Sequence, residues 1–387
     1  MPRLPNRTLE EFVKDYERTG QILRPNPDWE EDLRQTVVVT PEIAARVRTY
    51  TQVQKKKPRP ECRCQEAVSR PGVAPLIELN DGKTIPSLGL GTWLGFTKTG
   101  DREPVKDNSV QKAVEIAIDS GYRHIDTAAI YSTEQQVGAA IRKKIAEGAV
   151  AREDLFVTSK LWNNNHAKSA VVPALKMSLA KLGLKYLDLY LIHWPIAQTS
   201  LQEHATYADI DYVETWEGMM EAQALGLVKS IGVSNFNVTQ LDRLITMSKV
   251  KPAALQIEVN LNLQQEELIK FCKTHNIAVI GYTPFGSLFH NRAAKDAPPP
   301  RSDDQTLLKI ADRHHKTVAQ VNLRYLIELG VIPIPKSVTK KRIEANIEVF
   351  DFQLNQQERD VLKSFDRNYR TIAVTMWKDS PYYPFNK

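Results

Sequence analysis

The chain has 387 residues, of which 42% are hydrophobic and 25% are charged, and its mean hydropathy is -0.38. This length fits one large domain with an extension, and the composition is that of a globular protein, which excludes bulk disorder. The formal net charge of +6, from 52 basic and 46 acidic residues, is too small to indicate a nucleic-acid partner.

Cysteine usage and the lack of long apolar runs restrict the class further. Cys62, Cys64 and Cys272 are too few and too awkwardly spaced for a disulfide framework or a four-ligand zinc site. No stretch approaches the roughly 18 consecutive apolar residues of a membrane-spanning helix, and the amino terminus lacks an apolar signal core. We therefore expect a monomeric cytosolic protein that binds no metal, membrane or nucleic acid.

Residues 1–74 differ in composition from the rest of the chain. They contain the basic, proline-interrupted run KKKPRP at 55–60, and Thr8 with Glu11 form a possible capping box at the start of a short helix. We predict a partly helical or disordered extension over 1–74 and a single domain over 75–387. A mitochondrial presequence is an alternative, but the first residues are more acidic than such peptides.

From Leu76 onward, β-rich runs alternate with amphipathic helical patterns. The pair Asp81-Gly82 between two short runs predicts a β-hairpin. Eight strands follow: Ser87 to Trp93, Tyr122 to Ala128, Leu155 to Leu161, Leu187 to Trp194, Ser230 to Phe236, Ala254 to Asn260, Ala278 to Phe285 and Val331 to Ser337. Helices between them include Val110 to Ser120, Gln135 to Ala146, Ser169 to Leu182, Val213 to Leu225 and Gln265 to His275.

This alternation predicts the α/β class, as a parallel sheet covered by helices. Eight units over about 300 residues favour closure into a (β/α)8 TIM-type barrel, with the hairpin before it and a carboxyl-terminal tail after it. A doubly wound sheet is the alternative. The glycines Gly89, Gly91 and Gly95 have GxGxxxG spacing, which is wrong for a dinucleotide fingerprint of that fold.

Four polar residues follow or end consecutive predicted strands. They are Asp126, Tyr131, Lys160 and His193, and in a barrel of this kind the reacting groups come from the carboxyl ends of the strands. Taken singly, each has a purely structural explanation, such as a helix cap for Asp126 or a core histidine for His193. Together they suggest a catalytic group.

Their chemistry fits the reduction of a carbonyl group. A tyrosine such as Tyr131 can protonate the oxygen that becomes an alkoxide, and we expect the Lys160 ammonium to lower the tyrosine pKa. Asp126 would keep that ammonium charged, and His193 would orient the carbonyl oxygen by hydrogen bonding.

The sequence resembles the aldo-keto reductase family, in the branch of aldose and aldehyde reductases, over Leu76 to Lys387. The shared motifs include GLGTW, Asp126 to Tyr131, Ser159 to Trp162, His193-Trp194-Pro195, Gly232 to Phe236, Gln256 to Glu258, Ile334 to Thr339 and Tyr383-Pro384-Phe385. The resemblance implies NADPH-dependent reduction of aldehydes and ketones on a (β/α)8 barrel without a Rossmann domain, with Tyr131 as proton donor. It also implies a carbonyl reductase, because relatives that reduce carbon-carbon double bonds carry glutamate in place of His193.

The resemblance further implies contacts to the cofactor. Ser234, Asn235 and Gln256 would bind the nicotinamide amide, Tyr282 would stack on its ring, and Lys336 with Arg342 would favour NADPH through its 2'-phosphate. The complete implied set is Thr92, Trp93, Ser234, Asn235, Gln256, Tyr282, Thr283, Pro284, Phe285, Ser287, Lys336, Ser337, Val338, Thr339, Arg342 and Asn346. The small carbonyl substrate would meet Trp93, Tyr131, Trp162, His193 and Trp194, with Tyr369 and Trp377 as further aromatic candidates from the tail.

Several positions depart from the family pattern. Leu94 stands where aldose reductase has a lysine, and Ala345 replaces a glutamate of the adenine pocket. The loop after the seventh strand, Leu288 to Asp304, has no match for a substrate-site tryptophan. We therefore expect substrate walls that differ from those of aldose reductase.

A binding or scaffold protein on the same barrel, with 1–74 as its working part, is the alternative to an enzyme, because a fold does not fix a function. A short-chain dehydrogenase is excluded, because the only Tyr-x-x-x-Lys run, Tyr383 to Lys387, has proline after the tyrosine and could not lie on a helix.

Overall fold

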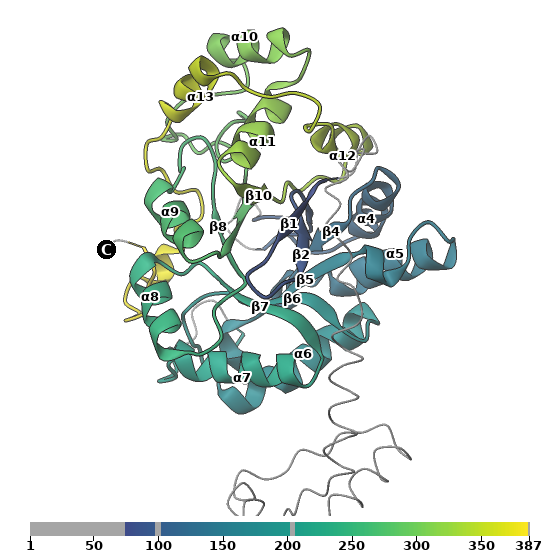
Figure 1. Cartoon of the computed structure of the whole chain (residues 1–387), viewed down its shortest axis with the longest axis vertical. Helices are drawn as coiled ribbons and strands as arrows, with labels where there is room; N and C mark the ends of the chain where they lie inside the picture. The colour runs from purple at the N-terminus through teal and green to yellow at the C-terminus, as the bar shows by residue number, and fades with distance from the viewer. Residues whose placement is uncertain (1–73, 97–101, 202–205, 386–387) are drawn as a thin grey trace, which may run out of the picture. The chain divides into compact units, whose positions relative to one another are not determined.

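The computed structural model describes residues 74–96, 102–201 and 206–385, which all belong to the unit Ser69–Lys387 (Figure 1). The helix expected near Thr8 lies outside the described residues. The extension over 1–74 and its boundary therefore stay predictions.

The domain opens with the predicted hairpin. β1 (Leu76–Glu78) pairs antiparallel with β2 (Thr84–Pro86), with Ile77 opposite Ile85. The turn contains Gly82, whose φ of 76° lies in the left-handed region that glycine adopts without a Cβ clash. The hairpin prediction is thus confirmed.

The eight barrel strands occur in the predicted order, and each pairs parallel with the next. They are β3 (Leu90–Gly91), β4 (His124–Asp126), β5 (Phe156–Leu161), β6 (Leu187–Ile192), β7 (Val228–Ser234), β8 (Ala254–Glu258), β9 (Ala278–Tyr282) and β10 (Val331–Pro333). Most are shorter than predicted, because several terminal residues of the apolar runs leave the ladder and carry site side chains instead.

Backbone hydrogen bonds between the first and last barrel strands close the sheet. The Gly89 N–H donates to the Pro333 carbonyl at 3.1 Å, and the Gly91 N–H donates to the Pro335 carbonyl at 3.2 Å. A Cβ on Gly91 would lie 2.8 Å from the Ile334 oxygen, so only glycine permits this approach. The closed (β/α)8 barrel is therefore the observed fold.

Helices surround the strands in Figure 1. They are α4 (Ser109–Asp119), α5 (Glu134–Ala146), α6 (Lys168–Leu182), α7 (Tyr212–Ala224), α8 (Val238–Met247), α9 (Glu266–Thr274), α10 (Gln305–Arg313), α11 (Val318–Glu328), α12 (Lys340–Ile347) and α13 (Gln356–Lys363). The five helices expected by range are present, with ends shifted by at most one residue. β9 is followed by two helices, α10 and α11, each starting at a side-chain cap, Asp304 and Thr317.

Side chains of the strands alternate between two apolar layers. Leu189 and Leu191 of β6 point into the barrel, whereas Tyr190 and Ile192 pack under the helices. The hairpin residues Leu79 and Ile85 belong to the inner cluster, so the hairpin closes the amino-terminal end of the barrel. The opposite end, where the strands finish, is left for polar residues. No helix among the described residues is long and apolar enough to cross a membrane.

Candidate active site

Asp126 and Lys160 form a buried ion pair at the carboxyl ends of β4 and β5. The Lys160 ammonium donates to Asp126 Oδ1 at 2.6 Å and to the Thr127 carbonyl at 2.9 Å. The exposed fractions of the two side chains are 0% for Lys160 and 2% for Asp126. The second carboxylate oxygen, Oδ2, accepts from Gln256 Nε2 at 2.7 Å. Both oxygens are thus occupied, which fixes the carboxylate and the ammonium in place.

Tyr131 and His193 lie beside this pair. Tyr131 ends the short 3-10 helix η1 (Ala129–Tyr131) that follows β4, and its ring centroid is 4.9 Å from the Lys160 ammonium. Its hydroxyl lies 3.5 Å from His193 Nε2. The other imidazole nitrogen, Nδ1, has no partner among the described residues. Four residues from consecutive strand ends therefore meet at one point, as the sequence predicted.

The electrostatics of the site differ in one respect from the expectation. Burial, and after it the Asp126 carboxylate, raises the pKa of Tyr131 well above its usual value. The expected lowering of this pKa by Lys160 is not found, because the loss of solvent and the neighbouring carboxylate both oppose phenolate formation. Burial also lowers the pKa of His193 well below its usual range, helped by the charges of Lys160 and Arg102. At neutral pH, Tyr131 is protonated and His193 is neutral.

A second hydrogen-bond network ties the predicted nicotinamide residues to these four. Asn235 Nδ2 donates to the His193 carbonyl at 2.9 Å, and Asn235 Oδ1 accepts from the Tyr282 hydroxyl at 2.7 Å. The Ser234 hydroxyl donates to the Gln256 carbonyl at 2.8 Å. These hydrogen bonds fix the side chains at the ends of β7, β8 and β9 next to the four residues of the candidate site.

The other predicted cofactor residues lie at the ends of β3, β9 and β10. Thr92 donates to the Asp126 carbonyl at 2.9 Å, and Pro284 accepts from Asn322 Nδ2 at 2.8 Å. The rest divide into buried or half-buried members, namely Thr283, Phe285, Ser287, Ser337 and Asn346, and exposed ones, namely Val338, Thr339 and Arg342. Arg342 and Asn346 both lie on α12, at its third and seventh residues.

Lys336 occupies a cationic surface beside β3. A shallow hollow there is lined by Gly91, Thr92, Lys336 and Ser337. Burial, and after it the charge of Arg292, lowers the pKa of Lys336, so a second cation acts on this ammonium. Lys336 makes no ion pair with a carboxylate among the described residues. This arrangement fits a phosphate group. Leu94, in contrast, packs against the apolar core, so it supplies no charge.

Four aromatic rings border the catalytic residues. Trp93 stacks on Tyr131 with centroids 6.2 Å apart, and Trp162 meets His193 edge-on at 5.1 Å. Trp194 and Trp377 pack edge-to-face at 5.2 Å. Trp377 of the tail therefore joins the predicted aromatic wall.

Tyr369, the other tail candidate, is not in that wall. Its hydroxyl donates to Asp296 Oδ1 at 3.5 Å, and no described ring contact joins it to the four tryptophans.

Sequence reasoning missed three charged residues. Arg102 lies over the Trp162 ring with its guanidinium carbon 4.9 Å from the centroid, and the charge of Arg292 acts on Lys336. Glu258, at the end of β8, accepts the backbone N–H groups of Thr371 and Ile372 at 2.8 and 2.9 Å and so holds the tail over the barrel. Of these, Glu258 carried a sequence signal, because it lies in the predicted strand Ala254 to Asn260 and in the shared motif Gln256 to Glu258.

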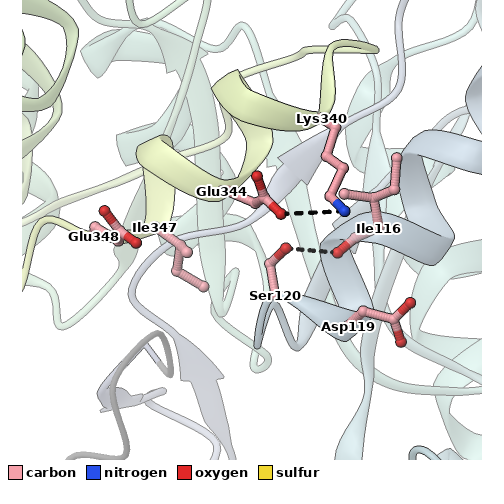
Figure 2. Close-up of a pocket in the computed structure, with 7 residues that line it drawn as sticks. All are labelled: Ile116, Asp119, Ser120, Lys340, Glu344, Ile347 and Glu348. Carbon is pink, nitrogen blue, oxygen red and sulfur yellow. Dashed lines mark hydrogen bonds and ion pairs between the residues drawn. The ribbon is translucent and has the colours of Figure 1, made fainter.

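A separate hollow of about 430 Å³ lies on the outer wall between α4 and α12 (Figure 2). Lys340 and Glu344, one turn apart on α12, pair at 3.8 Å on one side of it, and on the other side the Ser120 hydroxyl donates back to the Ile116 carbonyl at 2.7 Å. No strand-end residue lines this hollow, so it is not part of the candidate site.

Comparisons with known proteins agree with this geometry. The sequence model of the Aldo/keto reductase family matches residues 87–367. The chain is 52% identical over 311 residues to aldo-keto reductase AKR2E4 of Bombyx mori, an alignment that covers 80% of this chain and 98% of the relative. It is 40% identical to mouse aldo-keto reductase family 1 member D1 over 320 residues, with 80% and 96% covered.

Solved structures give the same result. The crystal structure of the Bombyx mori enzyme in complex with NADP matches with a TM-score of 0.77, covering 81% of this chain and 99% of that one. The aldose reductase of Schistosoma japonicum, 36% identical, matches with a TM-score of 0.73 and covers 81% and 99%.

Proposed function

The chain belongs to the Aldo/keto reductase family, and we propose that it is an NADPH-dependent reductase of aldehydes and ketones in which Tyr131 donates the proton. NADPH-dependent carbonyl reduction is the general activity of this family, and the related Bombyx mori enzyme has been crystallised with NADP. The observation that carries the assignment of Tyr131 is its position between the Lys160 ammonium and the His193 imidazole.

The residues present fit the cofactor. The hollow lined by Gly91, Thr92, Lys336 and Ser337 carries the Lys336 ammonium, on which the charge of Arg292 also acts, and such a cation suits a phosphate. We assign the nicotinamide amide to Ser234, Asn235 and Gln256. The amide nitrogen of Gln256 donates to Asp126, so the amide oxygen would accept a hydrogen bond from the cofactor. When bound, NADPH supplies a hydride to the carbonyl carbon.

The protein residues control the proton and the carbonyl oxygen. A carbonyl oxygen placed between the Tyr131 hydroxyl and His193 Nε2 receives hydrogen bonds from both, because the neutral imidazole can carry its proton on Nε2. As negative charge develops on that oxygen, Tyr131 gives up its proton. The Lys160 ammonium then stabilises the phenolate, and Asp126 keeps the ammonium charged.

The test is Tyr131→Phe. Loss of the acid should lower kcat by about 100- to 10,000-fold, while NADPH binding, followed by fluorescence, stays near the wild-type value, because the hydroxyl acts chiefly in the transition state. Tyr369→Phe is the matched control, since that tyrosine lies away from the site. A kcat near the wild-type value in Tyr131→Phe would show that Tyr131 is not the proton donor. A wild-type protein that binds NADPH but oxidises it with no aldehyde or ketone would indicate the scaffold function.

A further inference from the structure

Glu134 is a carboxylate buried behind the ion pair of the candidate site. It is the first residue of α5, three residues after Tyr131, and it is 1% exposed. Its Oε1 accepts from the Ser159 hydroxyl at 2.7 Å, whereas its Oε2 has no hydrogen-bond partner among the described residues. Lys181 lies 4.0 Å from Oε2 but is 41% exposed, so solvent screens this pair. A carboxylate buried with so little compensation adds little to stability.

Ser159 connects Glu134 to the strand that carries Lys160. In the sheet, Ser159 of β5 lies opposite Tyr190 of β6, and Tyr190 packs under the helices. Ser159 therefore lies on the outer face of the barrel, and its neighbour Lys160 lies on the inner face, because successive side chains of a strand alternate. Burial raises the pKa of the Tyr190 hydroxyl well above its usual value, so it stays neutral. Glu134 thus holds the end of β5 from the side opposite to the ammonium.

The segment between Tyr131 and Glu134 is also fixed. Thr133 precedes α5 and is 0% exposed, and its hydroxyl lies 3.1 Å from the hydroxyl of Thr127. The Thr127 carbonyl in turn accepts from the Lys160 ammonium at 2.9 Å. Tyr131 and Lys160 therefore belong to one buried hydrogen-bonded unit that Glu134 closes on its outer side.

Two carboxylates support the charge of Lys160. Burial lowers the pKa of this ammonium, and the negative charges of Asp126 and, to a smaller extent, Glu134 oppose the lowering. Burial raises the pKa of Tyr131, so the lysine is the first of the two to lose its proton as the pH rises. The other titratable groups that face Lys160 are the imidazoles of His124 on β4 and His193 after β6, and both are neutral at pH 7, because burial lowers their pKa.

We propose that Glu134 is a positioning residue for carbonyl reduction, which holds Lys160 in place and charged beside Tyr131 from the outer face of β5. The inference rests on the proposed function and adds a residue that acts through Lys160. Its hydrogen bond to Ser159 fixes the strand end, and its charge keeps the ammonium protonated to higher pH. Reduction needs that ammonium, because it stabilises the phenolate that Tyr131 becomes, and small displacements of such groups lower the rate.

Two substitutions separate the charge of Glu134 from its hydrogen bond. Glu134→Gln keeps an oxygen for Ser159 and removes the charge, so Lys160 should lose its proton at lower pH. With benzaldehyde, which is uncharged, and saturating NADPH, the alkaline limb of the kcat/KM profile should move down by about 0.5 to 1 pH unit. Ser159→Ala keeps the charge and removes the hydrogen bond. Its single-turnover rate at pH 7 should fall about 10-fold, with the alkaline limb and the half-saturating benzaldehyde concentration unchanged.

Glu358→Gln is the matched control. Glu358 is also a glutamate in the first turn of a helix and is 2% exposed, but it lies on α13 and pairs with Arg313 and His314. Its replacement removes the same charge and should leave both the alkaline limb and the single-turnover rate at their wild-type values. Urea unfolding of each variant sets a temperature at which it is folded during the assays.

An unmoved limb in folded Glu134→Gln, or an unchanged single-turnover rate in Ser159→Ala, overturns the inference while carbonyl reduction stands. An equal shift of the limb in Glu358→Gln would make the effect one of net charge and also overturns it. If Glu134→Gln does not fold, the rate of Ser159→Ala decides alone. Wild-type enzyme that reduces no aldehyde or ketone overturns the proposed function, and the inference with it.

Discussion

Replacing only one residue of the buried Asp126–Lys160 ion pair should lower the unfolding free energy far more than replacing both. In Asp126→Asn, the Lys160 ammonium stays at 0% exposure without its counter-ion at 2.6 Å. Breaking such a pair costs about 3 to 5 kcal/mol of unfolding free energy, because an uncompensated charge remains buried. Combining Asp126→Asn with Lys160→Met removes both charges and should restore most of that loss.

An exposed pair of nearly equal length provides the comparison. Lys168 and Glu217 are 2.7 Å apart, but each side chain is about half exposed. Glu217→Gln should therefore cost at most about 1 kcal/mol. Urea unfolding at pH 7, followed by tryptophan fluorescence, measures both variants and the double mutant.

The pH dependence adds an independent signature. Burial already lowers the pKa of Lys160, and the Asp126 carboxylate opposes that effect. Without Asp126, the lysine pKa falls further, so the folded state binds fewer protons than the unfolded state. The unfolding free energy of Asp126→Asn should then rise between pH 7 and pH 9 relative to that of wild type. A cost no larger than that of Glu217→Gln, with no such rise, would refute the account of the pair.

Two further expectations concern cofactor choice and acid stability. Arg342→Ala should weaken NADPH binding by about 1.5 to 3 kcal/mol and leave NADH almost unchanged, because the lost contact is to the 2'-phosphate; equal losses in titrations with the two cofactors would contradict it. Burial lowers the pKa of His124 and of His166 to about 3 from 6.5. As the pH falls below 6.5, these imidazoles are therefore protonated in the unfolded state but not in the folded state. Each should lower the unfolding free energy by about 2 kcal/mol between pH 7 and pH 5. Denaturant unfolding at both values should give a smaller loss in His166→Gln than in wild type, and an equal loss would exclude His166 as a source.

The parts of the site that sequence could predict are those set by local order. A strand places its last residue at a known edge of the sheet, so the sequence alone groups the polar residues at the ends of apolar runs, Asp126, Lys160 and His193. The hairpin followed from Asp81-Gly82 for the same reason, because a left-handed turn needs a residue such as Gly82.

The aromatic and cationic surroundings could not be predicted in this way. Trp377 and Tyr369 were equivalent candidates in the sequence, and only the tail path fixed by Glu258 places Trp377 in the wall and Tyr369 beside Asp296. Arg102 lies in a connection without periodicity, so its contact with Trp162 depends on where two distant segments meet.

The sequence by itself determined the eight-unit barrel, the hairpin and the order of the strand-end residues, because the apolar period and turn chemistry act between near neighbours along the chain. Only the tertiary structure decided the closure through Gly91 and the protonation of the site. The raised pKa of Tyr131 and the lowered pKa of His193 come from burial and from charges on other strands. Such effects act through space and depend on which segments the closed barrel brings together.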